Sequence, residues 1–176
     1  GTEQNTIFWY DDIAIVINIC EDISIEDWPA EEQVKQGASL IININASPYD
    51  IHKSETRKEI VMKKALKLNV PIIYLNMVGG QDELVFDGGS FVVNDFGEII
   101  YQASSFKEEV FHLDIDLKTN KQNDKSSLII RPKTIELKDI ESKPSLSKNE
   151  SIYSALKLGL LDYVRKNKFT KVLIGI

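Results

Sequence analysis

The sequence predicts a layered α/β fold, because three apolar segments typical of buried strands alternate with two helical segments. The apolar segments are rich in β-branched residues, as is typical of strands covered on both faces, and they comprise residues 13–19, 40–44 and 71–75. The helical segments between them comprise residues 29–36 and 54–68. This strand–helix–strand–helix–strand order indicates a sheet with helices packed against it.

Local signals mark the ends of both helices. Pro29 stands near the first turn of the shorter helix, and Gly37 follows its last residue. Ser54 is suited to cap the N-terminus of the longer helix. Apolar residues then recur at helical spacing, namely Ile60, Val61, Ala65 and Leu68. We expect the lysine-rich side of this helix to be a solvated outer face.

The pattern changes after the third predicted strand. Residues 76–90 contain four glycines and predict a loop. Residues 91–93 and 98–101 predict two strands joined by a tight turn. Residues 109–115 alternate between two kinds of side chain, with Phe111, Leu113 and Ile115 on one side, and predict a further strand.

A polar stretch then separates this region from a second apolar one. It is rich in Lys, Asn, Ser and Asp, which predicts a linker with short extended pieces such as residues 128–130. Residues 151–166 predict a helix with one apolar face, and residues 168–176 turn into a terminal strand. We therefore expect a main domain at residues 1–116, a linker at residues 117–148 and the start of a second domain at residues 149–176.

The two ends of the chain lead us to expect a fragment of a longer protein. The sequence begins without Met and ends within the apolar run of residues 171–176. Natural domains rarely stop inside a core strand, because the following turn and its cover would be missing. A frayed C-terminal tail is the alternative.

Composition and charge exclude several classes of function. A length of 176 residues fits one domain, or one domain and a piece of another, and a hydrophobic fraction of 43% excludes wholesale disorder. One cysteine and two distant histidines, His52 and His112, predict neither a disulfide framework nor a metal site. A net charge of −6 argues against nucleic-acid binding. Without a membrane-spanning run or a signal peptide, a reduced, cytoplasmic setting away from membranes is expected.

Cys20 is the first candidate for chemistry, because it follows the first buried strand directly. Ligands and nucleophiles in α/β folds collect where strands end and loops begin. The neighbouring carboxylates, Glu21 and Asp22, oppose ionisation of the thiol, so a nucleophilic Cys20 needs a base and a cation from elsewhere. The alternative is an inert small core residue.

Two further segments are candidates for ligand binding. Asn45 and Ser47 follow the second strand and offer polar contacts beside Cys20 if the two strands are neighbours, or else they cap backbone groups of a loop. The glycine-rich residues 76–90 lack the Lys-Ser/Thr ending of a phosphate-binding loop, and their carboxylates would repel phosphate. A loop for an amine-bearing or neutral ligand and plain turn chemistry both remain open.

Three segments together resemble the nitrilase-like glutaminase domain of glutamine-dependent NAD synthetases. They are residues 19–23 (ICEDI), 45–49 (NASPY) and 76–90 (NMVGGQDELVFDGGS). The third is the specific one, since Cys-Glu-Asp alone indicates only the broad carbon–nitrogen hydrolase superfamily. Residues 154–167 resemble the helix that opens the synthetase domain in that family. The resemblance implies the C-terminal half of a nitrilase-type α-β-β-α sandwich, followed by a linker and the first helix and strand of a Rossmann-like synthetase domain.

The resemblance also implies a chemistry. Cys20 matches the thiol of a Glu-Lys-Cys triad that attacks the side-chain amide of glutamine, giving a thioester and ammonia, with Glu as general base and Lys stabilising the oxyanion. Glu21 and Ser47 match positions that hold the glutamine. Four residues are expected near the pocket and the ammonia route: Gln81, Asp82, Glu83 and Asp87.

In such a family member the ammonia reaches a second active site. There, ATP activates nicotinic acid adenine dinucleotide, with Mg²⁺, and ammonia displaces AMP to give NAD. The glutaminase part itself needs no cofactor, and ATP and Mg²⁺ are expected to bind outside these 176 residues. A homo-oligomer is the expected assembly.

Departures from the family pattern limit what this chain does alone. Residues 1–19 match neither the Glu nor the Lys of the triad, so we expect the 176 residues alone to be inactive. Ser24 stands where a Trp is usual, with Trp28 further on, and Leu161 and Lys168 replace a common Arg and Gly. A stand-alone amidase of the nitrilase superfamily and a non-catalytic scaffold domain are the alternative functions.

Overall fold

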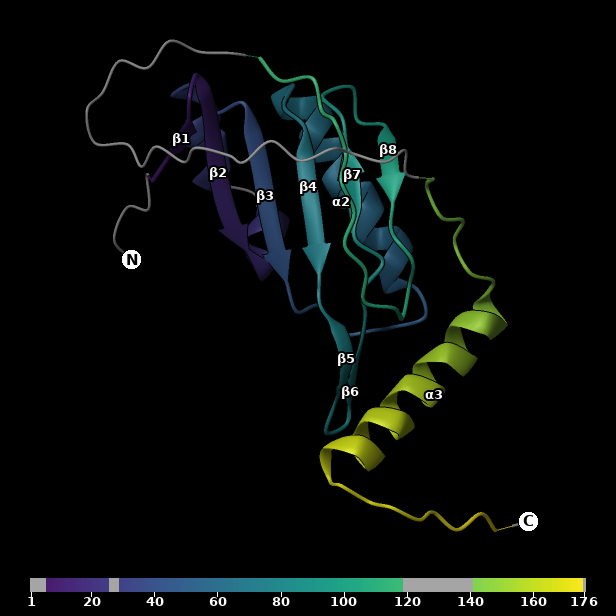
Figure 1. The fold of residues 1–176 in the computed structure, drawn as a ribbon. Helices are drawn as coiled ribbons and strands as arrows, with labels where there is room; N and C mark the ends of the chain where they lie inside the picture. Colours follow the sequence, from purple (N-terminus) through teal and green to yellow (C-terminus); the bar gives the residue numbers. More distant parts are fainter. Residues whose placement is uncertain (1–5, 26–28, 119–140, 176) are drawn as a thin grey trace.

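A computed structural model of the chain describes residues 6–25, 29–118 and 141–175. Its centre is a six-stranded sheet in the order β1-β2-β3-β4-β7-β8 (Figure 1). The strands are β1 (Phe8–Tyr10), β2 (Ile13–Ile19), β3 (Leu40–Asn45), β4 (Ile72–Asn76), β7 (Phe91–Val93) and β8 (Ile99–Gln102). β2, β3 and β4 run parallel, while β1, β7 and β8 pair antiparallel with their neighbours. The predicted α/β fold is confirmed, and β1 is a strand that the sequence pattern did not reveal.

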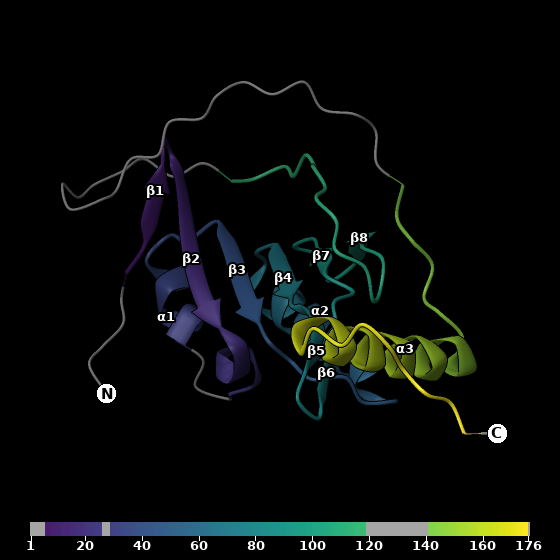
Figure 2. The ribbon, with the colours of Figure 1, turned by 60° about the horizontal axis from the view of Figure 1, so that its bottom comes forward.

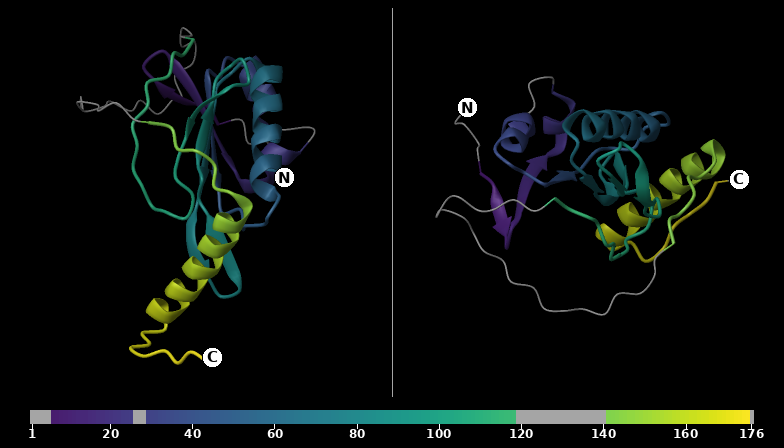
Figure 3. Two further views of the ribbon diagram at one scale, coloured as in Figure 1. Left: turned by 90° about the vertical axis from the view of Figure 1, so that its right-hand side faces the viewer. Right: turned by 90° about the horizontal axis from the view of Figure 1, so that it is seen from above.

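Two helices cover one face of the sheet, as Figure 3 shows from above. They are α1 (Pro29–Lys35) and α2 (Lys53–Leu68). Both bury their apolar side chains in the main core, where α1 contributes Ala30 and α2 contributes Val61 and Ala65. Each helix begins and ends within one residue of its predicted bounds, because the apolar period and the flanking Pro and Gly act locally.

The other face of the sheet is only partly covered by the residues that the structure describes. Residues 109–115 were expected to form a strand there, and this prediction is wrong, since they pair with no strand. Their alternation still has a structural role, because Phe111, Leu113 and Ile115 pack against Val92 and Tyr101. Nearer β2, isoleucine side chains such as Ile19, 66% exposed, are left open.

The glycine-rich residues 76–90 form a hairpin rather than the predicted loop. Its strands are β5 (Val78–Gln81) and β6 (Leu84–Asp87). Asp82, at its turn, has a positive φ of 52°. Gly80 is required by packing: a Cβ there would lie 3.0 Å from the Cα of Gly159 in the next helix. The glycines that suggested a loop therefore permit a close approach between a strand and a helix.

The helix α3 (Lys148–Lys166) lies against this hairpin, away from the sheet (Figure 2). It begins three residues before its predicted start, because Ser147 and Glu150 form a capping box. Asp162 accepts a hydrogen bond from the backbone N–H of Gly80 at 2.7 Å, and Lys166 donates to the carbonyl of the same residue. α3 is therefore attached to the hairpin through its polar side chains.

The predicted terminal strand is absent from residues 168–175 as the structure describes them. Leu173 and Ile174 are almost fully exposed. An extended segment becomes a strand only where a neighbouring strand satisfies its backbone groups, and these residues have none beside them. Residue 176 and the short extended piece expected at residues 128–130 lie outside the described residues. None of the described helices is long and apolar enough to cross a membrane.

Candidate active site

Cys20 directly follows the parallel strand β2, where the chain turns into a short 3₁₀ helix at Cys20–Ser24. Its φ of 51° is in the left-handed region, which is uncommon for residues other than glycine. Two hydrogen bonds hold this turn: Asp22 accepts from the backbone N–H of Ile19 at 2.9 Å, and Asn43 donates to the carbonyl of Cys20 at 3.4 Å. The half-buried thiol is thus presented by a rigid strand end.

The ends of β2, β3 and β4 meet at one edge of the sheet. The pairing registers place Ile19 beside Ile44 and Asn45 beside Asn76. β2 and β3 are thus neighbours, which is the condition under which Asn45 and Ser47 were expected beside Cys20. Asn45 itself donates to the carbonyls of Asn43 and Leu75, which fixes this end of the strand.

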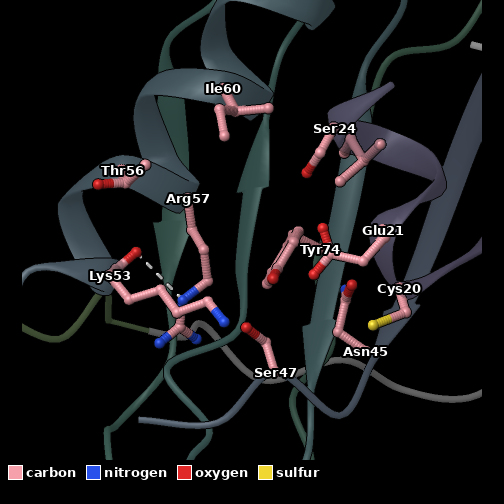
Figure 4. Close-up of a pocket in the computed structure, with 11 residues that line it drawn as sticks. Cys20, Glu21, Ser24, Asn45, Ser47, Lys53, Thr56, Arg57, Ile60 and Tyr74 are labelled. Atoms are coloured by element: carbon pink, nitrogen blue, oxygen red, sulfur yellow. Dashed lines mark hydrogen bonds between the residues drawn. The ribbon is translucent and has the colours of Figure 1, made fainter. Parts of the chain in front are cut away.

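A cavity of about 200 Å³ opens beside Cys20 (Figure 4). Strand ends form one wall and the first two turns of α2 form the other. Its lining residues are Cys20, Glu21, Ile23, Ser24, Asn45, Ser47, Lys53, Thr56, Arg57, Ile60 and Tyr74. Three residues predicted from the sequence, Cys20, Glu21 and Ser47, are thus brought together in one cavity.

The cationic wall of the cavity comes from α2, whose lysine-rich side was expected to be only a solvated surface. That prediction is wrong for Arg57, which is 8% exposed and faces inward with Lys53. Residues 53, 56, 57 and 60 share one helical face, so a search for a second, polar stripe on this helix would have found them. Among the described residues, no carboxylate forms an ion pair with Lys53.

Arg57 is neutralised by Asp87 at the end of β6. One terminal nitrogen of its guanidinium, Nη2, donates to both carboxylate oxygens of Asp87 at 2.9 Å. Asp87 is 5% exposed, so the ion pair is largely shielded from water. Its carboxylate does not line the cavity but contacts a residue that does.

Tyr74 connects the floor of the cavity to the core. Its ring stacks on Phe91 with centroids 4.9 Å apart. Burial raises the pKa of the Tyr74 hydroxyl, while the charge of Arg57 and a hydrogen bond with the side chain of Ser47 oppose that shift. The phenol is therefore protonated at neutral pH and is available to Ser47.

The other predicted pocket residues lie elsewhere. Gln81, Asp82 and Glu83 are exposed around the tip of the β5–β6 hairpin and are not among the residues that line this cavity. Lys166 of α3 donates to Gln81 at 3.0 Å. The hairpin is nevertheless joined to the cavity at its base, through the contact of Asp87 with Arg57.

The histidines stay outside the site, since His52 precedes α2 and His112 lies in the extended segment after β8. Within residues 6–25, 29–118 and 141–175, no group of three His, Cys, Asp or Glu side chains is arranged to hold a metal ion. A partly exposed thiol beside hydroxyl, carboxylate and cationic groups is suited to nucleophilic attack on a small polar substrate. No metal-binding role is visible in the described part of the chain.

The family model of carbon–nitrogen hydrolases matches residues 2–123. The chain belongs to the carbon–nitrogen hydrolase family. Two curated relatives of this chain are glutamine-dependent NAD(+) synthetases, from Aquifex aeolicus at 37% identity and Thermotoga maritima at 39%. The alignments cover 92% and 93% of this chain but only 31% and 32% of those proteins. The chain thus spans about a third of the length of the relatives it matches.

Solved structures agree with the family assignment. The glutamine-dependent NAD+ synthetase of Acinetobacter baumannii matches 95% of this chain with a TM-score of 0.75 and 33% identity, over 29% of its own chain. A carbon–nitrogen hydrolase from Helicobacter pylori matches 56% of the chain with a TM-score of 0.52 and 23% identity, which shows a shared fold. The nitrilase-like fold expected from the sequence is confirmed.

Proposed function

We propose that this carbon–nitrogen hydrolase chain carries the nucleophile and the substrate-binding wall of a glutaminase site in a glutamine-dependent NAD synthetase. The observation that carries the proposal is the meeting of Cys20, Glu21 and Ser47 in one cavity beside the cationic residue Lys53. The similarity to NAD synthetases over more than nine-tenths of the chain supports the choice of substrate.

The cavity matches the groups of a bound glutamine. A glutamine molecule carries an ammonium group, a carboxylate and a side-chain amide. Glu21 offers a carboxylate for the ammonium group, Lys53 offers a charge for the carboxylate, and Ser47 offers a hydroxyl for hydrogen bonding. These contacts leave the amide carbon for Cys20.

The reaction proceeds in two balanced steps. A general base takes the proton of the Cys20 thiol, and the sulfur bonds to the amide carbon of glutamine. The C–N bond then breaks, and the base passes the proton to the nitrogen, which leaves as ammonia. Water then attacks the thioester, glutamate is released, and the thiol regains its proton. The Glu and Lys that serve as base and oxyanion stabiliser in the family have no match in residues 1–19, so other parts of the enzyme supply them.

The proposal extends to the rest of the chain. Residues 1–116 form the C-terminal half of an α-β-β-α glutaminase domain, residues 117–148 a linker, and residues 149–176 the start of a Rossmann-like synthetase domain. Gln81, Asp82 and Glu83 belong to the route by which ammonia leaves, and Lys166 of α3 contacts the first of them. The second site uses ATP and Mg²⁺ to amidate nicotinic acid adenine dinucleotide, in a cytoplasmic homo-oligomer.

Replacement of the nucleophile in the full-length gene product tests this function. We expect Cys20→Ala to abolish NAD formation from glutamine while leaving NAD formation from added ammonia unchanged, because ammonia bypasses the glutaminase site. Lys63→Ala, on the exposed side of α2, is the control and retains both activities. Glutamine-supported NAD formation by Cys20→Ala would refute the proposal. Amide hydrolysis without any NAD formation would indicate a stand-alone amidase, and neither activity would indicate a scaffold.

A further inference from the structure

We propose that the buried ion pair of Arg57 and Asp87 is a positioning pair for the substrate pocket, acting on Ser47 through Asn76. The inference rests on the proposed glutaminase function. Neither Asp87 nor Asn76 lines the cavity, so both act at one remove from the substrate. The three polar side chains join α2, the hairpin base and the strand ends, which are otherwise separate parts of the fold.

The first link in this network is between Asp87 and Asn76. The amide nitrogen of Asn76 donates to Asp87 at 3.4 Å and to the carbonyl of Gly88 at 3.1 Å. A carboxylate accepts hydrogen bonds and donates none, so Asp87 requires the NH₂ end of the Asn76 amide to face it. The opposite end, the carbonyl oxygen, is thereby directed away from Asp87.

The second link is between Asn76 and Ser47. The carbonyl oxygen of Asn76 accepts from the backbone N–H of Ser47 at 3.0 Å, and its amide nitrogen lies 3.4 Å from the Ser47 carbonyl. One side chain therefore holds both backbone groups of a residue in the pocket wall. Because Asp87 and the Gly88 carbonyl together set the orientation of the Asn76 amide, the position of Ser47 depends in part on Asp87.

The role of Arg57 is to hold the Asp87 carboxylate in place and to balance its charge. A buried carboxylate without a cation would be costly, and Arg57 supplies the compensating charge from α2. Because Arg57 is paired with Asp87, Lys53 is the cation in the cavity wall that can bind the carboxylate of the substrate. Arg57 and Asp87 are therefore positioning residues rather than catalytic ones.

A purely structural ion pair makes a different prediction, and steady-state kinetics of the full-length gene product separate the two. We expect Asp87→Asn to raise KM for glutamine by at least about tenfold, with a smaller change in kcat, because a displaced Ser47 weakens substrate binding. Arg57→Lys retains the charge but removes the guanidinium nitrogen that contacts both oxygens of Asp87, and it is expected to give an intermediate KM. NAD formation from ammonia stays unchanged in both, and Glu59→Gln, an exposed variant of α2, retains the parent KM.

The double variant Arg57→Met/Asp87→Leu decides between positioning and stability. Apolar side chains in place of a buried ion pair leave no unpaired charge and commonly preserve the fold. Asn76 loses one of its three acceptors and keeps the carbonyls of Gly88 and Ser47, so we expect folded protein with a raised KM and faster hydrogen exchange at the Ser47 amide. A return of KM to the parent value in this variant would overturn the inference and leave the glutaminase function standing. A parent protein that uses no glutamine would instead overturn the proposed function and this inference with it.

Discussion

The left-handed conformation of Cys20 is maintained by side chains on two elements. Asp22, two residues further on, caps the preceding N–H, and Asn43 on β3 binds the Cys20 carbonyl. A strained residue persists only when its surroundings hold it. The single cysteine of the chain thus lies at a sheet edge that is fixed by three parallel strands.

At the same scale, Tyr74 is expected to assist substrate binding through Ser47. Tyr74→Phe retains the stacked ring on Phe91 and removes the hydroxyl. The loss of one hydrogen bond, worth about 1 kcal/mol, predicts roughly a fivefold rise in KM for glutamine in the full-length protein. Tyr101→Phe is a matched control, since Tyr101 is also buried but packs in the second cluster. Equal kinetics for the two variants would contradict this role.

At the scale of elements, α3 is held at both ends by specific contacts. Its N-terminus has the Ser147–Glu150 capping box, and its later turns bind Gly80 through Asp162 and Lys166. The hairpin and the helix pack closely at Gly80 and Gly159, which have no side chains to hold the backbones apart. A Cβ at Gly80 would lie 3.0 Å from the Cα of Gly159, and a Cβ at Gly159 would lie 3.0 Å from the side chain of Val85, so either substitution would require its neighbour to shift.

The capping box makes the N-terminus of α3 sensitive to acid. Hydrogen bonds from the Ser147 hydroxyl and N–H lower the pKa of Glu150 below its usual value. Since the folded pKa lies below the unfolded one, the stabilisation is complete above the unfolded pKa and is lost as the pH falls through the folded pKa. We expect faster amide exchange at residues 148–151 below about pH 4. This pH dependence should vanish in Glu150→Gln and persist in Glu141→Gln, and its persistence in Glu150→Gln would contradict the assignment.

At the scale of the whole molecule, the described residues cover only one face of the sheet well. The helical face has a continuous core, whereas Ile17, Ile19 and Ile44 on the other face remain substantially exposed. The expectation that the central strands are covered on both faces is therefore wrong for the residues described. The Cys20 cavity opens at the edge of the sheet between the helical wall and the strand ends.

The 176 residues alone are expected to hydrolyse no glutamine. Cys20 needs a general base and an oxyanion-stabilising cation, and the Glu and Lys of the family have no match before it. Ammonia release from glutamine, measured with the purified 176-residue chain, should equal that of Cys20→Ser. Ammonia release that the Cys20→Ser substitution abolishes would contradict this prediction.

Several features followed from the sequence because their causes are local. Apolar periods and flanking Pro and Gly residues predicted both core helices and the central strands. Cys20 was found because a polar, reactive residue directly after an apolar run lies at the end of a strand. Ser47 was found in the same way, after the next strand.

Tertiary structure decided what depends on distant partners. Arg57 looked like one more cation on a solvated helix, and it became part of the pocket only because Asp87, 30 residues away, lies buried opposite it. Residues 78–87 form a hairpin that contains two glycines, and the missing Cβ of Gly80 allows the backbone of α3 to approach closely. Residues 109–115 and 171–175 have apolar patterns, but their backbones pair with no neighbouring strand, so they form no strand themselves. The sequence by itself determined the α/β order and the place of Cys20 after a buried strand, whereas charge pairing, close packing and strand pairing were decided by which segments meet in space.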